Sequence, residues 1–142
     1  FLINPNDKIF FAAGNMTGRI VDFCISNNAP IPKTPAEFAR CIFDSLAHAY
    51  REAILDFEEV ESQTFEAIYV VGGGSANDFL NQITADITGK KVITGVVEAT
   101  LLGNIGMQAI VAGEISGLSQ LREMISSSIT QKIFLPSQLC EA

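Results

Sequence analysis

Three consecutive glycines, Gly72, Gly73 and Gly74, are the part of this chain best suited to hold a ligand through the main chain. Glycine lacks a Cβ atom, so it adopts positive φ angles without strain and lets another molecule approach the backbone closely. Ser75 and Asn77 follow at once. If Ser75 is the N-cap of a helix, the unpaired N–H groups of the first helical turn face the same place. These residue types in this order predict a nucleotide-binding turn.

The residues on either side of the glycines predict a strand before them and a helix after them. Ala67–Val71 is too short for a helix and rich in β-branched residues, which favours a buried strand. Apolar residues at helical spacing, Phe79, Leu80 and Ile83, indicate the helix, and Gly89 is placed to end it. Ligands of open α/β sheets bind at the carboxyl ends of the strands, which is where the glycines fall.

The two best-known phosphate-binding motifs fit this turn poorly. A P-loop requires a lysine after its last glycine, and the dinucleotide motif requires a third glycine where Asn77 stands. We therefore expect the turn to contact an adenine or a ribose rather than to cradle a phosphate. The alternative is a strand-to-helix turn that holds three glycines for its geometry alone.

Composition and charge narrow the classes of partner. The 142 residues suit one domain, and a hydrophobic content of 48% is enough to build a core. A net charge of −7, without any run of lysine or arginine, argues against nucleic acid or an anionic membrane as partner. No apolar run reaches the ~18 residues of a membrane-spanning helix. We expect a cytoplasmic protein, and a chain that opens with Phe1 is interpreted as a piece of a longer one.

Cysteine and histidine are too sparse to predict a metal site. The three cysteines, Cys24, Cys41 and Cys140, include no CxxC pair, and the single histidine is His48. Zinc or iron–sulfur ligation is therefore not expected. Cys24 and Cys41 can meet if their two helices pack together, which leaves a disulfide open, but in a reducing compartment we expect free thiols.

The rest of the chain predicts further helices and a second strand. Thr34 and Glu37 form a capping box with Pro35 at the first helical position, so a long helix begins there and runs to about Glu59. We also expect helices over 16–26, 98–112 and 116–128, a strand over 91–94 and an extended run over 132–135. The chain then divides into an irregular connector with a short helix (1–33), a main α/β part (34–136) and a tail (137–142).

The long helix is expected to bury one apolar stripe and to expose its charges. The stripe comprises Phe38, Ile42, Leu46, Ala49, Ala53 and Phe57. The titratable or charged side chains that fall mostly off the stripe are Asp44, His48, Arg51, Glu52, Asp56 and Glu58. We interpret them as a solvated face, and His48 as a surface charge rather than a catalytic base.

The helix over 98–112 is apolar on nearly every side and contains Gly103 and Gly106. Glycine inside a helix costs roughly 1 kcal/mol relative to alanine, so two of them indicate that another group comes close. A neighbouring helix is the favoured cause, and a wall of the nucleotide site is the alternative. Glu98, near the start of this helix, suits the helix dipole rather than a role as a base.

The number of strands is too small for the number of helices. Two strands do not make a stable sheet, since three or more are usually needed, so we expect further strands upstream. The uncovered edge of such a sheet could also pair with a second copy of the chain, which would give a homodimer.

Several stretches resemble the carboxyl-terminal half of carbohydrate kinases of the FGGY family. The strongest are VGGGSANDFLNQITADITG (Val71–Gly89) and VEATLLGNIGMQAIVAG (Val97–Gly113). FLINP (Phe1–Pro5), ARCIFDSLA (Ala39–Ala47) and two cysteines 17 positions apart are similar to the bacterial members that phosphorylate L-rhamnulose. The resemblance runs from the first residue to about Pro136. It is broken at Val96, where a proline is common.

The resemblance implies an α/β fold of the ribonuclease-H-like type, as in the actin-like ATPase superfamily. The chain would be the carboxyl-terminal portion of the second of two such domains, which close over ATP and a ketose. The family transfers the γ-phosphoryl group of ATP, bound with Mg²⁺, to a sugar hydroxyl, and here the implied product is L-rhamnulose 1-phosphate. The implied nucleotide contact is Gly73, surrounded by Gly72, Gly74, Ser75 and Asn77.

The resemblance also implies what this chain lacks. In family members the aspartate that serves as base, the phosphate-binding loops, the sugar site and the Mg²⁺ ligands lie upstream. No catalytic residue is therefore assigned here, and neither Asp44 nor Asp86 is a substitute. We expect a kinase as the parent protein, and a piece that is inactive by itself.

Three alternatives stay open. A dinucleotide-binding oxidoreductase would need an acidic residue about 20 positions beyond the glycines, where Thr94 and Gly95 stand. A non-catalytic actin-like or sensor module would share the same turn. A kinase for another substrate, such as L-fuculose, L-xylulose or glycerol, would share the same domain.

Overall fold

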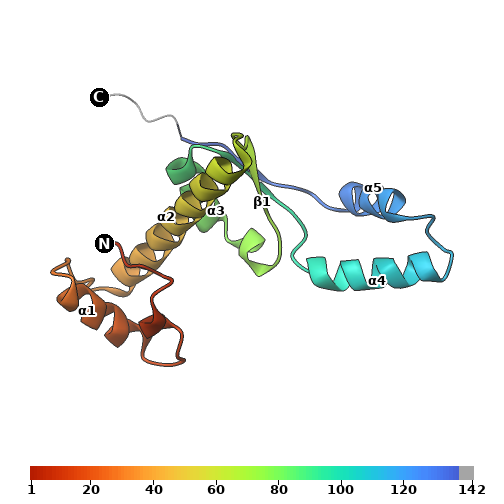
Figure 1. Cartoon of the computed structure of the whole chain (residues 1–142). Helices are drawn as coiled ribbons and strands as arrows, with labels where there is room; N and C mark the ends of the chain where they lie inside the picture. Colours follow the sequence, from red (N-terminus) through yellow and green to blue (C-terminus); the bar gives the residue numbers. More distant parts are fainter. Residues whose placement is uncertain (138–142) are drawn as a thin grey trace.

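A computed structural model describes residues 1–137, so residues 138–142 of the expected tail, with Cys140, lie outside the described part. The elements are η1 (Lys8–Phe10), α1 (Met16–Ser26), α2 (Pro35–Glu61), β1 (Ala67–Val70), η2 (Gly73–Ala76), α3 (Asp78–Thr88), β2 (Lys91–Thr94), α4 (Ala99–Val111), α5 (Leu118–Ser128) and β3 (Ile133–Phe134). Figure 1 shows α1 and α2 toward one end of the molecule and α4 with α5 at the other, with α3 and β1 between them. The mixed α/β class is as predicted.

A small core joins α1 to the first half of α2. Its buried members are Ile20, Cys24 and Cys41, which we call the N-terminal core. Cys24 and Cys41 are both free thiols, and burial raises the pKa of Cys41. The Ser45 hydroxyl donates to the Cys41 carbonyl (2.5 Å) and accepts the Ile3 N–H (2.9 Å). The expected connector therefore covers this core through Ile3 and Phe10, and Ile3 is hydrogen-bonded to α2.

The start of α2 follows the capping box read from the sequence. The Glu37 N–H donates to Thr34 Oγ1 (3.2 Å), and the Thr34 N–H donates back to Glu37 Oε2 (3.0 Å). The Lys33 N–H also donates to this carboxylate, at 2.6 Å. The hydrogen bonds from Lys33 and Thr34 hold the pKa of Glu37 below its ordinary value. At its far end α2 stops at Ser62, which is left-handed with φ 53°.

The apolar stripe expected along α2 is correct only in its first half. Phe38 and Ile42 pack against the N-terminal core. Ala53 and Phe57 are exposed, Phe57 by 63%. α1 packs against the first part of α2, and α3 also contacts α2 there, since Phe43 lies against Phe79. Glu58, expected to be solvated, is half-buried, and its carboxylate accepts from Lys90 Nζ and the Phe65 N–H.

The sheet has three strands in the order β1-β2-β3. β1 and β2 are parallel, with Ala67 opposite Lys91, and α3 forms the crossover between them. β3 pairs antiparallel with β2, with Phe134 opposite Val92. The expectation of two strands is therefore wrong, because the run over 132–135 supplies a third. The outer edge of β1 has no partner strand within residues 1–137.

The two faces of the sheet are covered unequally. α3 packs on the sheet and α2 packs on α3. Val92 and the residues opposite it on the flanking strands, Ile68 and Phe134, form one row across the sheet. This row is well covered, since Val92 is fully buried and the other two residues are half-buried. In the next row, Tyr69 and Ile133 flank Ile93 and are exposed by 67% and 59%. This second face is open at both outer strands.

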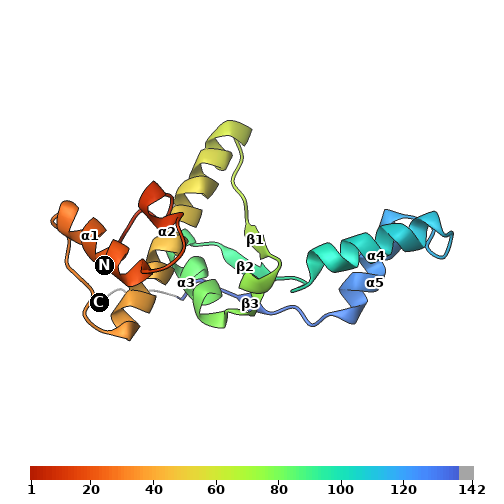
Figure 2. The same ribbon diagram turned by 90° about the horizontal axis from the view of Figure 1, so that it is seen from below.

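α4 and α5 form an arm (residues 99–128) that points away from the rest of the described chain, which we call the body. Both views show the two helices of the arm running side by side (Figures 1 and 2). α5 comes so close to Gly106 that a Cβ atom there would collide with the Leu121 side chain, whereas Gly103 faces open space. The close helix predicted from these glycines is therefore confirmed at Gly106.

The arm leaves the sheet and rejoins it at one point. The Thr94 N–H donates to the Lys132 carbonyl (2.9 Å), and the Lys132 N–H donates to Thr94 Oγ1 (3.0 Å). These bonds close the chain between β2 and β3. Within residues 1–137, no helix combines the length and apolar character that crossing a membrane requires.

Candidate nucleotide-binding site

The glycine turn (residues 72–77) is clamped at its first residue to the end of β2. Gly72 has φ 81° and ψ −167°, a conformation that L side chains rarely adopt. The Gly72 N–H donates to the Val96 carbonyl (2.9 Å), and the Gly95 N–H donates to the Val70 carbonyl (2.7 Å). These bonds continue the parallel ladder past the ends of both strands. The turn therefore lies at the carboxyl edge of the sheet, where the sequence places it.

The roles expected for Ser75 and Asn77 have to be corrected. Ser75 is not the N-cap of α3, because it lies within the short 3₁₀ turn η2 and its hydroxyl donates to the Gly72 carbonyl (2.7 Å). Asn77 is the N-cap instead, since its Oδ1 accepts the Leu80 N–H (3.0 Å). Three glycines leave enough backbone freedom for η2 to form before the helix begins. Ser75 is buried at 5% exposure, so its side chain holds the turn from inside.

The middle of the turn presents main-chain donors to solvent. Gly73 and Gly74 are exposed, and neither N–H has an acceptor among residues 1–137. A Cβ atom at Gly73 would meet nothing within 4 Å, and one at Gly74 would meet only the Val70 side chain at 3.9 Å. These positions are therefore open rather than sealed under neighbouring atoms. Two adjacent free N–H groups can bind an acceptor of a ligand.

One ion pair lies beside the turn. Asp78, in the first turn of α3, accepts from Lys132 Nζ at 2.7 Å, and both side chains are exposed. A carboxylate suits a helix N-terminus, and the lysine offsets its charge there. Lys132 precedes β3 in the chain, so only the fold brings it to the turn. No local pattern predicts this pair, because the two residues are far apart in the chain.

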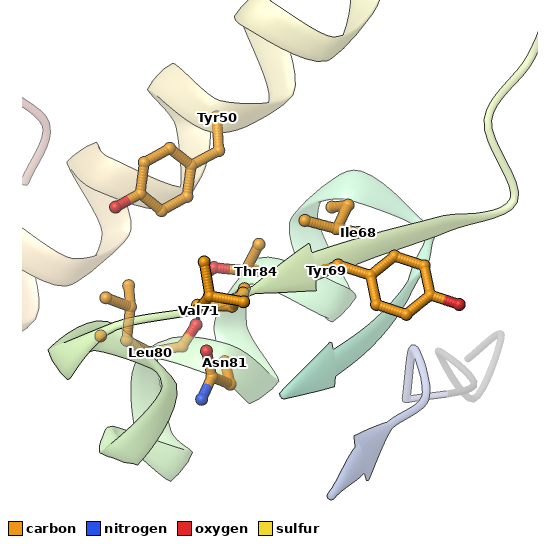
Figure 3. A pocket seen from close by; sticks show the side chains of 9 residues that line it. Tyr50, Ile68, Tyr69, Val71, Leu80, Asn81 and Thr84 are labelled. Atoms are coloured by element: carbon orange, nitrogen blue, oxygen red, sulfur yellow. Dashed lines mark hydrogen bonds between the residues drawn. The ribbon is translucent and has the colours of Figure 1, made fainter. Parts of the chain in front are cut away.

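A cavity of about 310 Å³ borders the turn at Gly74. Figure 3 shows Tyr50 reaching toward it from α2, and Leu80, Asn81 and Thr84 from α3. The four consecutive residues 68–71 also line it, so the cavity follows the unpaired edge of β1 and meets both faces of that strand. The complete lining is Tyr50, Ile68, Tyr69, Val70, Val71, Gly74, Leu80, Asn81 and Thr84.

The buried face of α3 is more polar than its sequence pattern predicts. Phe79, expected to face inward, is 50% exposed and lies against Phe43 of α2, with ring centroids 5.6 Å apart. Asn81 and Thr84 are each only 2% exposed. Asn81 Nδ2 donates to the Ser75 carbonyl (3.1 Å), which ties α3 to the glycine turn. Sequence reasoning missed Asn81, which lies between Leu80 and Gln82 and carries no local signal of burial.

The other titratable residues considered from the sequence lie in different surroundings. His48 lines a separate cavity of about 450 Å³ with residues of the N-terminal segment, α1 and α2. Asp44 forms an exposed ion pair with Arg40 at 2.8 Å. Burial alone would raise the pKa of Asp86, but hydrogen bonds from the Ser137 N–H and Gln82 outweigh it and lower the pKa. Within residues 1–137, no three His, Cys, Asp or Glu side chains gather in a way that could hold a metal ion.

A parallel strand–helix–strand unit with an open glycine turn at its carboxyl edge defines a candidate nucleotide-binding α/β domain. Residues 1–112 match the C-terminal domain of the FGGY family of carbohydrate kinases, and the chain belongs to this family.

The chain is similar to rhamnulokinases along nearly its whole length. It is 40% identical over 136 residues to the rhamnulokinase of Enterobacter sp. (strain 638), which covers 96% of this chain and 28% of that protein. It is 42% identical over 135 residues to the rhamnulokinase of Pectobacterium atrosepticum, covering 95% of this chain and 27% of that protein. It is 40% identical over 137 residues to the Bacillus subtilis rhamnulokinase, covering 96% of this chain and 28% of that protein. The chain thus spans little more than a quarter of the length of these curated relatives.

Proposed function

We propose that this chain is the adenosine-binding, carboxyl-terminal part of an ATP-dependent sugar kinase that phosphorylates L-rhamnulose to its 1-phosphate. The observation that carries the proposal is the pair of free N–H groups at Gly73 and Gly74. They stand at the carboxyl edge of a parallel sheet, in a chain of the FGGY family. The similarity to rhamnulokinases supports L-rhamnulose as the sugar.

ATP would contact the turn at Gly73, where nothing obstructs the main chain. Gly72 and Gly74 give the close approach, while Ser75 and Asn77 hold the turn with their side-chain hydrogen bonds. When bound, ATP supplies the γ-phosphoryl group, and catalysis then depends on positioning and charge stabilisation. Within residues 1–137 no three His, Cys, Asp or Glu side chains gather in a way that could hold a metal ion. We propose that the Mg²⁺ ligands and the aspartate base lie outside these 142 residues, in a region corresponding to the rest of the longer relatives, and that the chain alone is inactive.

The same part would complete a ribonuclease-H-like domain. In the described part of the chain the outer edge of β1 is unpaired, and residues from both faces of this strand line the cavity along it. An added strand would satisfy the free backbone groups and fill the cavity with its side chains. We therefore assign this cavity to a strand of the amino-terminal part rather than to the nucleotide. The alternative is that the β1 edge pairs with a second copy of the chain. A cytoplasmic location is a separate prediction.

The activity is tested by coupled ADP release from the full-length protein that contains this chain. L-Rhamnulose, L-xylulose, L-fuculose and glycerol are compared at equal concentrations. The proposal expects the highest kcat/KM with L-rhamnulose. Turnover of another substrate alone would reassign the sugar, and no turnover with any of them would favour the non-catalytic sensor module.

The site is tested by Gly73→Val in the same full-length protein. Because a Cβ at Gly73 has open space and Gly73 does not adopt a positive φ angle, the fold should tolerate valine. We expect the KM for ATP to rise about tenfold or more, with a nearly unchanged melting temperature. Gly103→Val is the matched control, since Gly103 also faces open space but lies in the arm. A large loss of stability with unaltered ATP affinity would instead indicate that the glycines serve turn geometry alone.

A further inference from the structure

Asn81 occupies an unusual place for a polar side chain. It lies in the second turn of α3 and is 2% exposed, yet its neighbours along the helix include Leu80 and Ile83. An apolar residue of similar size would fill this position without the cost of removing an amide from water. The amide is compensated by one hydrogen bond, from Asn81 Nδ2 to the Ser75 carbonyl at 3.1 Å. That bond leaves the helix and reaches the glycine turn.

The bond completes a set of anchors at Ser75. The Ser75 N–H and hydroxyl both donate to the Gly72 carbonyl, at 3.0 Å and 2.7 Å. The Ser75 carbonyl in turn accepts from Asn81 Nδ2. Gly72 is in turn fastened to Val96 by its own N–H (2.9 Å). Both ends of the segment 72–75 are therefore fixed. The N–H groups of the two residues between them, Gly73 and Gly74, take part in none of these internal bonds.

We propose that Asn81 is a positioning residue for the nucleotide, acting through Ser75 to hold the Gly73 and Gly74 N–H groups in the binding conformation. The inference rests on the proposed function. Asn81 makes no contact with the ligand itself in this arrangement. Because Asn81 already holds the turn in one conformation, the turn loses less conformational entropy when the nucleotide binds, and the free-energy cost of binding is lower.

Thr84 provides a matched control from the same helix. It is equally buried at 2% exposure and lines the same cavity. Its hydroxyl, however, donates to the Leu80 carbonyl within α3 (2.8 Å) and does not reach the turn. A purely structural role for buried polar groups on this face would affect both residues alike.

The test compares Asn81→Leu, Asn81→Asp and Thr84→Val in the full-length protein that contains this chain. Asn81→Asp keeps the size of the side chain but replaces the donor with an acceptor opposite the Ser75 carbonyl. We expect both Asn81 variants to raise the KM for ATP about tenfold, with the KM for the sugar changed by less than about twofold. Thr84→Val should leave the ratio of these two KM values unchanged. An unchanged KM for ATP in the folded Asn81 variants would overturn the proposal.

Amide hydrogen exchange of residues 73–77 without nucleotide gives a readout independent of activity. The Asn81 variants should exchange faster there than the parent and Thr84→Val. If the unsubstituted full-length protein binds no ATP, the proposed function fails, but the exchange rates still test whether Asn81 holds the turn. Unchanged exchange rates in the Asn81 variants would then refute that role. If Asn81→Leu does not fold, Asn81→Asp decides by the same two measurements.

Discussion

The body and the arm of this molecule are held together in different ways. The body is joined by bonds between residues far apart in the chain, such as Lys90 Nζ to Glu58 Oε1 at 2.6 Å. Its central strand carries the fully buried Val92. The arm is joined mainly by the contact of α4 with α5 at Gly106. Its helix α4 nevertheless leaves large apolar side chains exposed, with Val111 at 85% and Leu101 at 54%.

The difference shows that apolar content alone does not tell where a core lies. α4 is the more apolar helix by sequence, yet the more polar α3 is the one that packs between the sheet and α2. An apolar helix surface of this kind needs a cover. The body therefore determines the position of the glycine turn, whereas the arm depends on what lies against it. The predictions below test this division, beginning with the largest effect.

Replacing one valine in the body and one in the arm by aspartate should change the free energy of unfolding by very different amounts. Val92→Asp puts an unpaired charge into the centre of the sheet and should lower the free energy of unfolding by about 4 kcal/mol or more. Val111→Asp, at an exposed position of the arm, should change it by less than about 0.5 kcal/mol. Urea unfolding followed by circular dichroism measures both. Equal losses would mean that the arm is packed as firmly as the body.

The contact inside the arm can be opened without touching the body. Gly106→Val places side-chain atoms where Leu121 stands, so it should weaken the α4–α5 pair by about 2 kcal/mol. Amide exchange should become faster over residues 99–128 and stay the same in β1, β2 and α3. The control is Gly103→Ala, which meets open space and should stabilise α4 by up to about 1 kcal/mol. Faster exchange throughout the body would show that the two regions unfold together.

The smallest effect is expected from the ion pair that ties α2 to the end of α3. Glu58 accepts from Lys90 Nζ and from the Phe65 N–H (2.7 Å), and these bonds lower the pKa of Glu58 from its ordinary value of 4.5. A carboxyl whose pKa is lower in the folded state stabilises the fold above its unfolded pKa. This stabilisation is lost as the pH falls through the folded value. Thermal melts between about pH 6 and pH 3 measure it.

Removing the lysine should reduce this pH dependence. Lys90→Met is expected to lower the melting temperature near neutral pH and to flatten its fall in acid. Arg40→Met is the control, because it removes an exposed pair with Asp44 that is worth roughly 0.2–0.5 kcal/mol. If the two variants have the same pH profile, Glu58 and Lys90 do not fasten the body.

Local signals in the sequence predicted much of the fold. The capping box at Thr34, the end of α3 at Gly89 and both parallel strands occur as expected, because each depends on a few neighbouring residues. The position of the glycine turn at the sheet edge follows from the same local pattern. Its proposed ligand contacts remain a prediction.

The features that sequence reasoning missed depend on partners distant in the chain. β3 is only two residues long and becomes a strand because β2 offers it an edge. Phe57 is exposed because nothing within residues 1–137 covers its side chain, and Asn81 is buried while its amide donates to the Ser75 carbonyl. Ser75 looked like an N-cap because residue type and spacing cannot distinguish a helix start from a short 3₁₀ turn. Each of these outcomes required knowledge of the tertiary partner.

The meeting of Thr94 and Lys132 has a consequence for variation in this domain. The segment between Thr94 and Lys132, which contains the arm, starts and ends at two residues that are hydrogen-bonded to each other. The distance between its ends therefore does not set its length. The entropy of closing such a loop grows only with the logarithm of its length. Insertions or deletions in residues 99–128 should therefore be tolerated without moving the nucleotide turn.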